Sequence, residues 1–245
     1  MPRAYTMPFL AQRLIQQALN WIFPSNEEPC PVCSRPIPAR LADSQAPRPD
    51  GMRTLCAFCQ QNLALVPIQA QVLRLRAAGR PMIVASALVY DHFVRTLIRA
   101  LKYDRVVEIA PFFASALAAT RGAHPPADVV VPVPTAPDRL RMRGYDHVLL
   151  VARAFARADS LPLKPCLARL GSSGHTRSQT AKDKLRRLRE LEGQFVAMDA
   201  GGIRGRRVLL VDDVITTGAT ITTCAHVLYA AGAREVHAAV IARVE

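Results

Sequence analysis

The spacing of hydrophobic positions changes at about residue 80. Beyond it, short runs of consecutive apolar residues alternate with segments whose apolar residues recur every three or four positions. Buried strands alternating with amphipathic helices predict an α/β domain with a mostly parallel sheet. The expected strands are Met82–Tyr90, Asp128–Val133, Val208–Val214 and Val236–Val244, and the expected helices span 92–103, 106–120, 144–158, about 178–190 and 218–231.

The first 79 residues follow other patterns. Residues 1–23 repeat apolar side chains at helical spacing, which predicts an amphipathic helix docked on the body; a transit peptide or a membrane-surface helix is the alternative. Residues 24–65 are punctuated by Pro and Cys and show little periodicity. We therefore expect three parts: a helix over 1–23, a small module over 24–65 and the α/β domain over 80–245.

Composition and charge narrow the class of protein. The 245 residues are 50% hydrophobic, which excludes disordered and fibrous classes and suits one sizeable core plus an appendage. No uncharged stretch resembles a membrane span. The net charge is +13, and 28 of the 32 basic residues are Arg, whose forked donors suit phosphate. Residues 139–189 hold 13 basic and three acidic side chains, so either an anionic partner or a solvated basic face lies there.

Four cysteines form two CxxC pairs, Cys30 with Cys33 and Cys56 with Cys59, separated by 22 residues. Two such turns can surround one ion with four thiolates, so we expect a closed, structural zinc site in a zinc-ribbon-like module. Disulfides or a redox pair are the alternatives, and the metal interpretation implies a reducing, cytoplasmic location. Cys166 and Cys224 are interpreted as packing residues.

An apolar run ending in two acids, Val208 to Asp213, is followed by Thr216-Thr217-Gly218-Ala219-Thr220 at the start of a predicted helix. Amide groups at a helix start, threonine hydroxyls and a close approach at Gly218 suit a phosphomonoester. The acids would repel that phosphate but would bind sugar hydroxyls or magnesium. The pattern favours a ribose 5-phosphate, with an ordinary strand and capped helix as the alternative.

This segment resembles the phosphoribosyl-pyrophosphate (PRPP) motif of type I phosphoribosyltransferases. The resemblance implies a doubly wound sheet with helices on both faces, Asp212 and Asp213 at the ribose, and Thr216, Thr217, Gly218, Ala219 and Thr220 at the 5-phosphate. The four-Cys segment and the ordered motifs at 97–103, 131–134, 139–145 and 176–179 are similar to the ComF family of competence-associated proteins. Two departures are Asp146-His147, where that family usually has Asn-Gln, and Glu190 in place of an Asn.

Basic residues supply the expected catalytic and pyrophosphate contacts. Arg139, Arg141 and Arg143 alternate, so on an extended loop they would share one face toward a departing pyrophosphate, whereas on a helix they would diverge. Solvated Arg side chains at a helix start are the alternative. We expect Asp212, Asp213, Arg139 and Arg143 to be catalytic, and the remaining pyrophosphate and flap contacts to come from Pro134, Thr135, Arg141, Thr176, Arg177 and Gln179.

Three functions remain open from the sequence. The first is a magnesium- and PRPP-dependent phosphoribosyltransferase linked to DNA uptake. The second is a non-catalytic protein that binds single-stranded DNA and works with other DNA-uptake proteins, with Arg141, Arg186 and Arg187 as candidate contacts. The third is a purine or pyrimidine salvage transferase. Arg99 and Lys102 are weaker candidates for the site, and His147 is interpreted as packing or capping.

Overall fold

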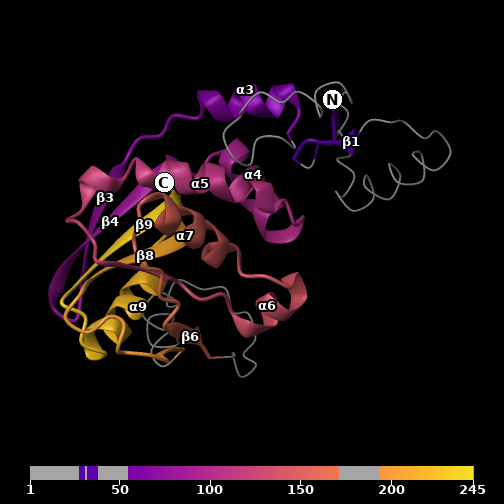
Figure 1. Ribbon diagram of the computed structural model, residues 1–245. Helices are drawn as coiled ribbons and strands as arrows, with labels where there is room; N and C mark the ends of the chain where they lie inside the picture. The colour runs from indigo at the N-terminus through magenta and orange to yellow at the C-terminus, as the bar shows by residue number, and fades with distance from the viewer. Residues whose placement is uncertain (1–27, 31, 38–54, 171–193, 245) are drawn as a thin grey trace, which may run out of the picture.

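A five-stranded sheet forms the centre of the molecule (Figure 1). The computed structural model describes residues 28–30, 32–37, 55–170 and 194–244. Strand order is β3-β4-β9-β8-β5; β3 pairs antiparallel with β4, and the other neighbours are parallel. The strands are β3 Gln71–Ala77, β4 Arg80–Val89, β5 Val129–Pro132, β8 Arg207–Ile215 and β9 Glu235–Arg243.

All four expected strands are present, with ends within two residues of the expected ones. The edge strand β3 was not expected. Its residues alternate, so that Val72, Arg74 and Arg76 are exposed while the residues between them are half-buried. An edge strand with one face in water carries fewer apolar residues than a central strand, and this weakens its signal in the sequence.

Helices cover both faces of the sheet. On one face α4 His92–Tyr103, α5 Ala110–Ala118 and α7 His147–Ala158 pack against Val130, Leu209 and Ile241. On the other, α9 Ala219–Ala230 packs against Val129, Val131 and Leu210. The side chains of consecutive residues in β5 and β8 thus point into the cores on opposite faces of the sheet, as is expected for a strand buried on both sides. The doubly wound arrangement is confirmed, and helix α4 has the expected bounds.

Residues 137–143 form helix α6, Pro137–Arg143, and not the extended loop on which Arg139, Arg141 and Arg143 would share a face. The helical alternative is therefore the one present, and Arg141 diverges from the other two arginines. Pro137 and Asp138 favour the helix start, and Gly144 ends the helix with φ +81° and a hydrogen bond from its N–H to the Leu140 carbonyl. These helix start and stop signals are present in the sequence, whereas the alternation of the three arginines favours an extended loop. The helix expected over 144–158 begins at His147 as α7, after the N-cap Asp146.

The cysteine-containing segment folds as a two-residue ladder, β1 Glu28–Pro29 with β2 Pro36–Ile37, followed by α3 Ala57–Leu65. Its buried residues join the same core as α4, α5 and α7. The remaining elements are the 3-10 turns η1 Val107–Ile109 and η2 Arg121–Ala123 and the ribbon β6 Leu167–Arg169 with β7 Phe195–Ala197. The expected helices over 1–23 and about 178–190 lie outside the described residues. Among those described, no helix combines the length and apolar character needed to cross a bilayer.

Candidate functional site

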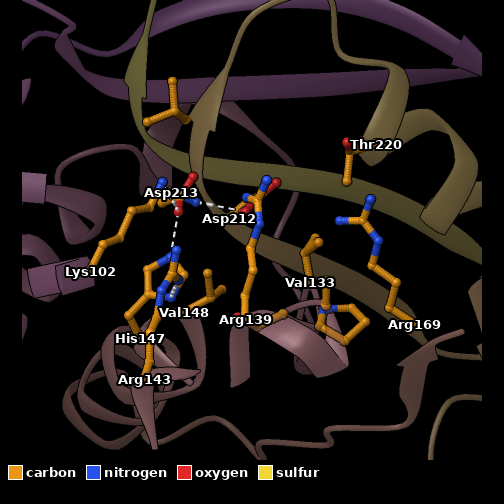
Figure 2. A pocket seen from close by; sticks show the side chains of 14 residues that line it. Lys102, Val133, Arg139, Arg143, His147, Val148, Arg169, Asp212, Asp213 and Thr220 are labelled. Carbon is orange, nitrogen blue, oxygen red and sulfur yellow. Dashed lines mark hydrogen bonds and ion pairs between the residues drawn. The ribbon is translucent and has the colours of Figure 1, made fainter. Parts of the chain in front are cut away.

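A cavity of about 180 Å³ opens at the carboxyl ends of β5 and β8 (Figure 2). In a parallel sheet this edge is where ligands bind, since the loops there diverge to opposite faces. The lining comes from α4, the loop after β5, α6, α7, β6, the end of β8 and the start of α9. Its polar members are Lys102, Thr135, Arg139, Arg143, His147, Arg169, Asp212, Asp213 and Thr220.

Asp213 is the buried acid of the cavity and has two donors. Lys102 Nζ lies 2.6 Å and His147 Nε2 lies 2.5 Å from the same oxygen, Oδ2. Burial opposes the charge on this carboxylate, but the hydrogen bond from His147 and the positive charge of Lys102 outweigh it and hold the pKa of Asp213 below its usual value. Asp213 is therefore a fixed negative charge in the cavity.

The pKa of the neighbouring residue Asp212 shifts in the opposite direction. Burial and the adjacent negative charge of Asp213 raise the pKa of Asp212 well above its usual value. Oδ1 of Asp212 accepts the amide of Asp213 at 2.8 Å, which orients the side chain. The two adjacent carboxylates thus differ, since the pKa of Asp213 is lowered and the pKa of Asp212 is raised.

Arg139 and Arg169 also bring positive charge to the cavity (Figure 2). Burial, followed by repulsion from Arg139, lowers the pKa of Arg169. The Arg169 guanidinium also lies 5.3 Å from the centre of the Phe195 ring. Two guanidinium groups facing one small space repel each other unless an anion lies between them, so the space next to Arg139 and Arg169 suits an anionic ligand.

Three buried polar atoms of this lining lack a hydrogen-bond partner: Thr135 Oγ1, Arg143 Nε and Arg169 Nε. Such atoms are uncommon because burying an unpaired donor costs about 1–3 kcal/mol. Five atoms in the described residues are unpaired in this way, and these three surround the same cavity. Their clustering indicates that a ligand with acceptor oxygens completes the site.

The loop between β8 and α9 has the form expected of a phosphate cradle. Thr216 and Thr217 are exposed, and Gly218 is the N-cap of α9 with φ +78°. Gly218 has no side chain with which to cap this helix, whereas Asp91 caps α4 and Asp146 caps α7. The hydroxyl of Thr217 accepts the amide of Ala219 at 3.4 Å, and the following amides of the first turn suit an anion.

The structure brings seven of the expected site residues into the cavity lining: Pro134, Thr135, Arg139, Arg143, Asp212, Asp213 and Thr220. Thr216, Thr217, Gly218 and Ala219 lie beside it in the loop. Arg141 is exposed and is not part of the lining, because neighbours two apart on a helix diverge. The expected contacts Thr176, Arg177, Gln179, Arg186 and Arg187, and the departure at Glu190, lie outside the described residues.

Sequence reasoning undervalued three residues of the site. Lys102 was a weak candidate, His147 was interpreted as a packing residue, and Arg169 was not considered. A basic residue in the last turn of a helix, as Lys102 is, ordinarily complements the helix dipole. Only the packing of α4 and α7 beside the end of β8 brings Lys102 and His147 to Asp213, and no local pattern encodes that contact.

The four cysteines of the N-terminal segment converge. Their sulfur atoms all lie within 4.8 Å of one another, with Cys30 and Cys59 at 3.9 Å and Cys33 and Cys56 at 3.4 Å, and none of the four is in a disulfide. Four sulfurs bound at about 2.3 Å to a tetrahedral ion would be about 3.8 Å apart, so the spacing fits a metal such as zinc. The cysteine pairs come from the β1–β2 turn and the start of α3.

Comparison with known proteins agrees with this architecture. The phosphoribosyl transferase domain family matches residues 157–245, which include β8, the acidic pair and α9. The chain is 31% identical over 117 residues to Competence protein F of Haemophilus influenzae, covering 47% of this chain and 50% of that protein. It is 28% identical over 149 residues to Competence protein ComFC of Streptococcus pneumoniae, covering 60% and 62%. The alignments thus span about half to three-fifths of these relatives.

Among solved structures, glutamine PRPP amidotransferase from B. subtilis is 27% identical, covering 55% of this chain and 26% of that one, with a TM-score of 0.39. The domain match and the sheet order confirm the expected phosphoribosyltransferase-like fold. The competence relatives, together with the four-cysteine cluster, confirm the resemblance to the ComF proteins. Lys102, Arg139, Arg143 and His147 precede the segment matched by the domain family.

Proposed function

We propose that this ComF-like, phosphoribosyltransferase-like protein binds PRPP with Mg²⁺ and transfers its phosphoribosyl group to an acceptor nucleophile, in a process connected with DNA uptake. The observation that carries the proposal is that two carboxylates and several basic side chains line one cavity, where Arg143 and Arg169 have unpaired buried donors. PRPP needs both kinds of group, since its ribose hydroxyls suit carboxylates and its 5-phosphate and pyrophosphate suit cationic donors.

The loop at 216–220 and the first amides of α9 would hold the 5-phosphate. Asp212 and Asp213 would accept the ribose hydroxyls. Because Lys102 and His147 both contact Oδ2 of Asp213, the other oxygen of that carboxylate, Oδ1, is the one offered to the sugar. A fixed carboxylate of this kind discriminates a ribose from a ligand without vicinal hydroxyls.

Arg139, Arg169 and Thr135 would bind the pyrophosphate. During transfer, the bond between C1 and the pyrophosphate oxygen breaks, and its electron pair leaves with the pyrophosphate. The acceptor nucleophile forms the new bond to C1 and loses its proton. The arginines contribute by neutralising the charge that develops on the leaving group, in positions they hold before the ligand binds.

The carboxylates at the cavity also fit magnesium. Mg²⁺ binds to proteins through one or two carboxylates together with substrate phosphates, and Asp212 lines the cavity, where no Lys or Arg of the described residues forms an ion pair with its carboxylate. Asp212 would hold the ion, which would neutralise charge on the departing pyrophosphate. In the cysteine cluster we assign zinc, since four thiolates at tetrahedral spacing leave no open coordination position.

Calorimetric titration of PRPP with Mg²⁺ tests the proposal. We expect wild type to bind, and Asp212→Asn and Arg139→Gln to bind roughly ten- to hundred-fold more weakly, because each removes a charge-assisted contact. Arg141→Gln is the matched control for Arg139→Gln, since both are exposed arginines of α6 but only Arg139 lines the cavity. Negligible heat with wild type, or equal affinity in wild type and both site variants, would contradict the proposal.

A second candidate function is the binding of single-stranded DNA without catalysis. The observation in its favour is the exposed position of Arg141 outside the cavity, beside Arg139 on the same helix. Two relatives are named as competence proteins. Fluorescence anisotropy with a labelled oligonucleotide, repeated across a salt series, tests this function. Phosphate contacts predict that affinity falls steeply with salt and that Arg141→Gln weakens it; affinity that salt leaves unchanged would count against this function.

A further inference from the structure

A chain of hydrogen bonds joins four separate elements at the cavity (Figure 2). Arg143 Nη1, at the end of α6, lies 3.0 Å from His147 Nδ1 at the start of α7. His147 Nε2 in turn lies 2.5 Å from Asp213 Oδ2 in β8, and Lys102 of α4 lies 2.6 Å from the same oxygen. Arg143 and His147 are only 5% and 4% exposed, so water does not substitute for these contacts.

The donors and acceptors of this chain permit one arrangement of protons. A guanidinium group has N–H donors and no acceptor, so its bond to Nδ1 requires the lone pair of that nitrogen. The proton of a neutral imidazole then resides on Nε2, where Asp213 Oδ2 accepts it. A second proton on Nδ1 would face the N–H donor of Arg143 and would add a positive charge beside those of Arg143 and Lys102. Arg143 therefore holds His147 as the neutral Nε2–H tautomer.

This arrangement fixes the carboxylate of Asp213. Both Lys102 and His147 donate to Oδ2, so the Asp213 side chain cannot rotate without losing both of these contacts. The remaining oxygen, Oδ1, is then held in one place toward the cavity. Lys102 and His147 would therefore affect ligand binding through Asp213, because they keep its carboxylate in the orientation that a ligand contact requires.

We propose that His147 is a positioning residue that orients Asp213 for the ribose hydroxyls and does not exchange protons with the substrate. The inference rests on the proposed function, since it takes a ribose as the ligand. It also explains why the Asn-Gln of the ComF pattern and the Asp146-His147 of this chain are compatible with one site. A glutamine at 147 has a carbonyl to accept from Arg143 and an amide to donate to Asp213, as the neutral histidine does.

The test compares His147→Gln with His147→Leu in the full chain. His147→Gln preserves both hydrogen bonds and is expected to bind PRPP with Mg²⁺ within about threefold of wild type, whereas His147→Leu binds about tenfold or more weakly. His92→Leu is the matched control, because Asp91-His92 begins α4 as Asp146-His147 begins α7, but His92 is exposed and outside the cavity. Equal binding by His147→Leu and wild type, or no rescue by glutamine, would overturn the positioning role.

Nuclear magnetic resonance supplies a readout that needs no ligand. In wild type, the ¹⁵N signals of His147 should report a bare Nδ1 and a protonated Nε2; a proton on Nδ1 would refute the tautomer. The ¹³Cγ signal of Asp213 should shift in His147→Leu and remain in His147→Gln, and an unchanged signal in both would refute the contact. Absence of PRPP binding in wild type would defeat the proposed function, while these two signals would still decide whether His147 orients Asp213.

Discussion

Two features of the structure, the backbone conformation and the packing, favour glycine at position 218. Its φ of +78° is a conformation that strains any residue with a side chain, and a Cβ built there would lie 2.6 Å from Leu75 Cδ1 of β3. The sequence indicated Gly218 for the close approach of a phosphate to the backbone. The contact with Leu75 adds a packing reason that comes from an edge strand the sequence did not reveal.

Alanine substitutions at three glycines distinguish the effect of the left-handed backbone from the effect of the Leu75 contact. Gly218→Ala should lower the free energy of unfolding by about 1–2 kcal/mol for the left-handed backbone, and by more for displacing Leu75. Gly79 has φ +73° and nothing within 4 Å of a built Cβ, so Gly79→Ala should lower the free energy of unfolding only by the cost of the left-handed backbone. Gly122 has neither a left-handed backbone nor a neighbour within 4 Å, so Gly122→Ala should change the free energy of unfolding little. Urea unfolding measures all three. A Gly218→Ala variant no less stable than Gly79→Ala would show that Leu75 gives way freely.

At the scale of elements, the N-cap residue Asp146 joins helix α7 to the loop after β5. Oδ1 of Asp146 caps α7 by accepting the amide of Leu149 at 3.0 Å, and Oδ2 accepts the amide of Thr135 at 3.1 Å. Thr135 lines the cavity and His147 follows Asp146, so one side chain sets the geometry of both. The sequence predicted a helix here but could not predict that its cap also holds a loop of the site.

Asp146→Ala should therefore affect both stability and ligand binding. Loss of the cap costs about 1 kcal/mol, and release of Thr135 should weaken PRPP binding severalfold. Asp91→Ala is the control, because Asp91 caps α4 in the same manner, with Oδ1 2.7 Å from the amide of Val94, but neither residue lines the cavity. Thermal unfolding and calorimetry on both variants distinguish the roles. Equal PRPP affinity in the two variants would mean that the Thr135 contact is unimportant.

At the scale of the whole molecule, the cysteine cluster is connected to the core behind the site. Cys30, Cys56, Cys59 and Leu63 belong to the same buried group as α4, α5 and α7. Helix α4 carries Lys102, so the module supports an element of the cavity. A segment of this size gains most of its stability from a bound metal and from packing against a larger body.

Loss of the metal should thus destabilise more than the module. We expect about one zinc per chain by elemental analysis, almost none in a Cys30→Ser, Cys59→Ser double variant, and a fall in the free energy of unfolding on the order of 3 kcal/mol. Cys166→Ala is the control, since Cys166 is a buried cysteine outside the cluster. A protein purified without metal, or a double variant as stable as wild type, would contradict the assignment of zinc.

The sequence by itself determined the strands β4, β5, β8 and β9, the pairs of cysteines, and the acidic pair followed by a phosphate loop. Each of these depends on neighbouring residues whose spacing is visible along the chain. Only the tertiary structure decided that Arg139 lines the cavity while Arg141 does not, and that Lys102 and His147 meet at Asp213. Those contacts join residues from α4, α7 and β8, and their distances depend on how helices pack across a sheet, which no local pattern of residues specifies.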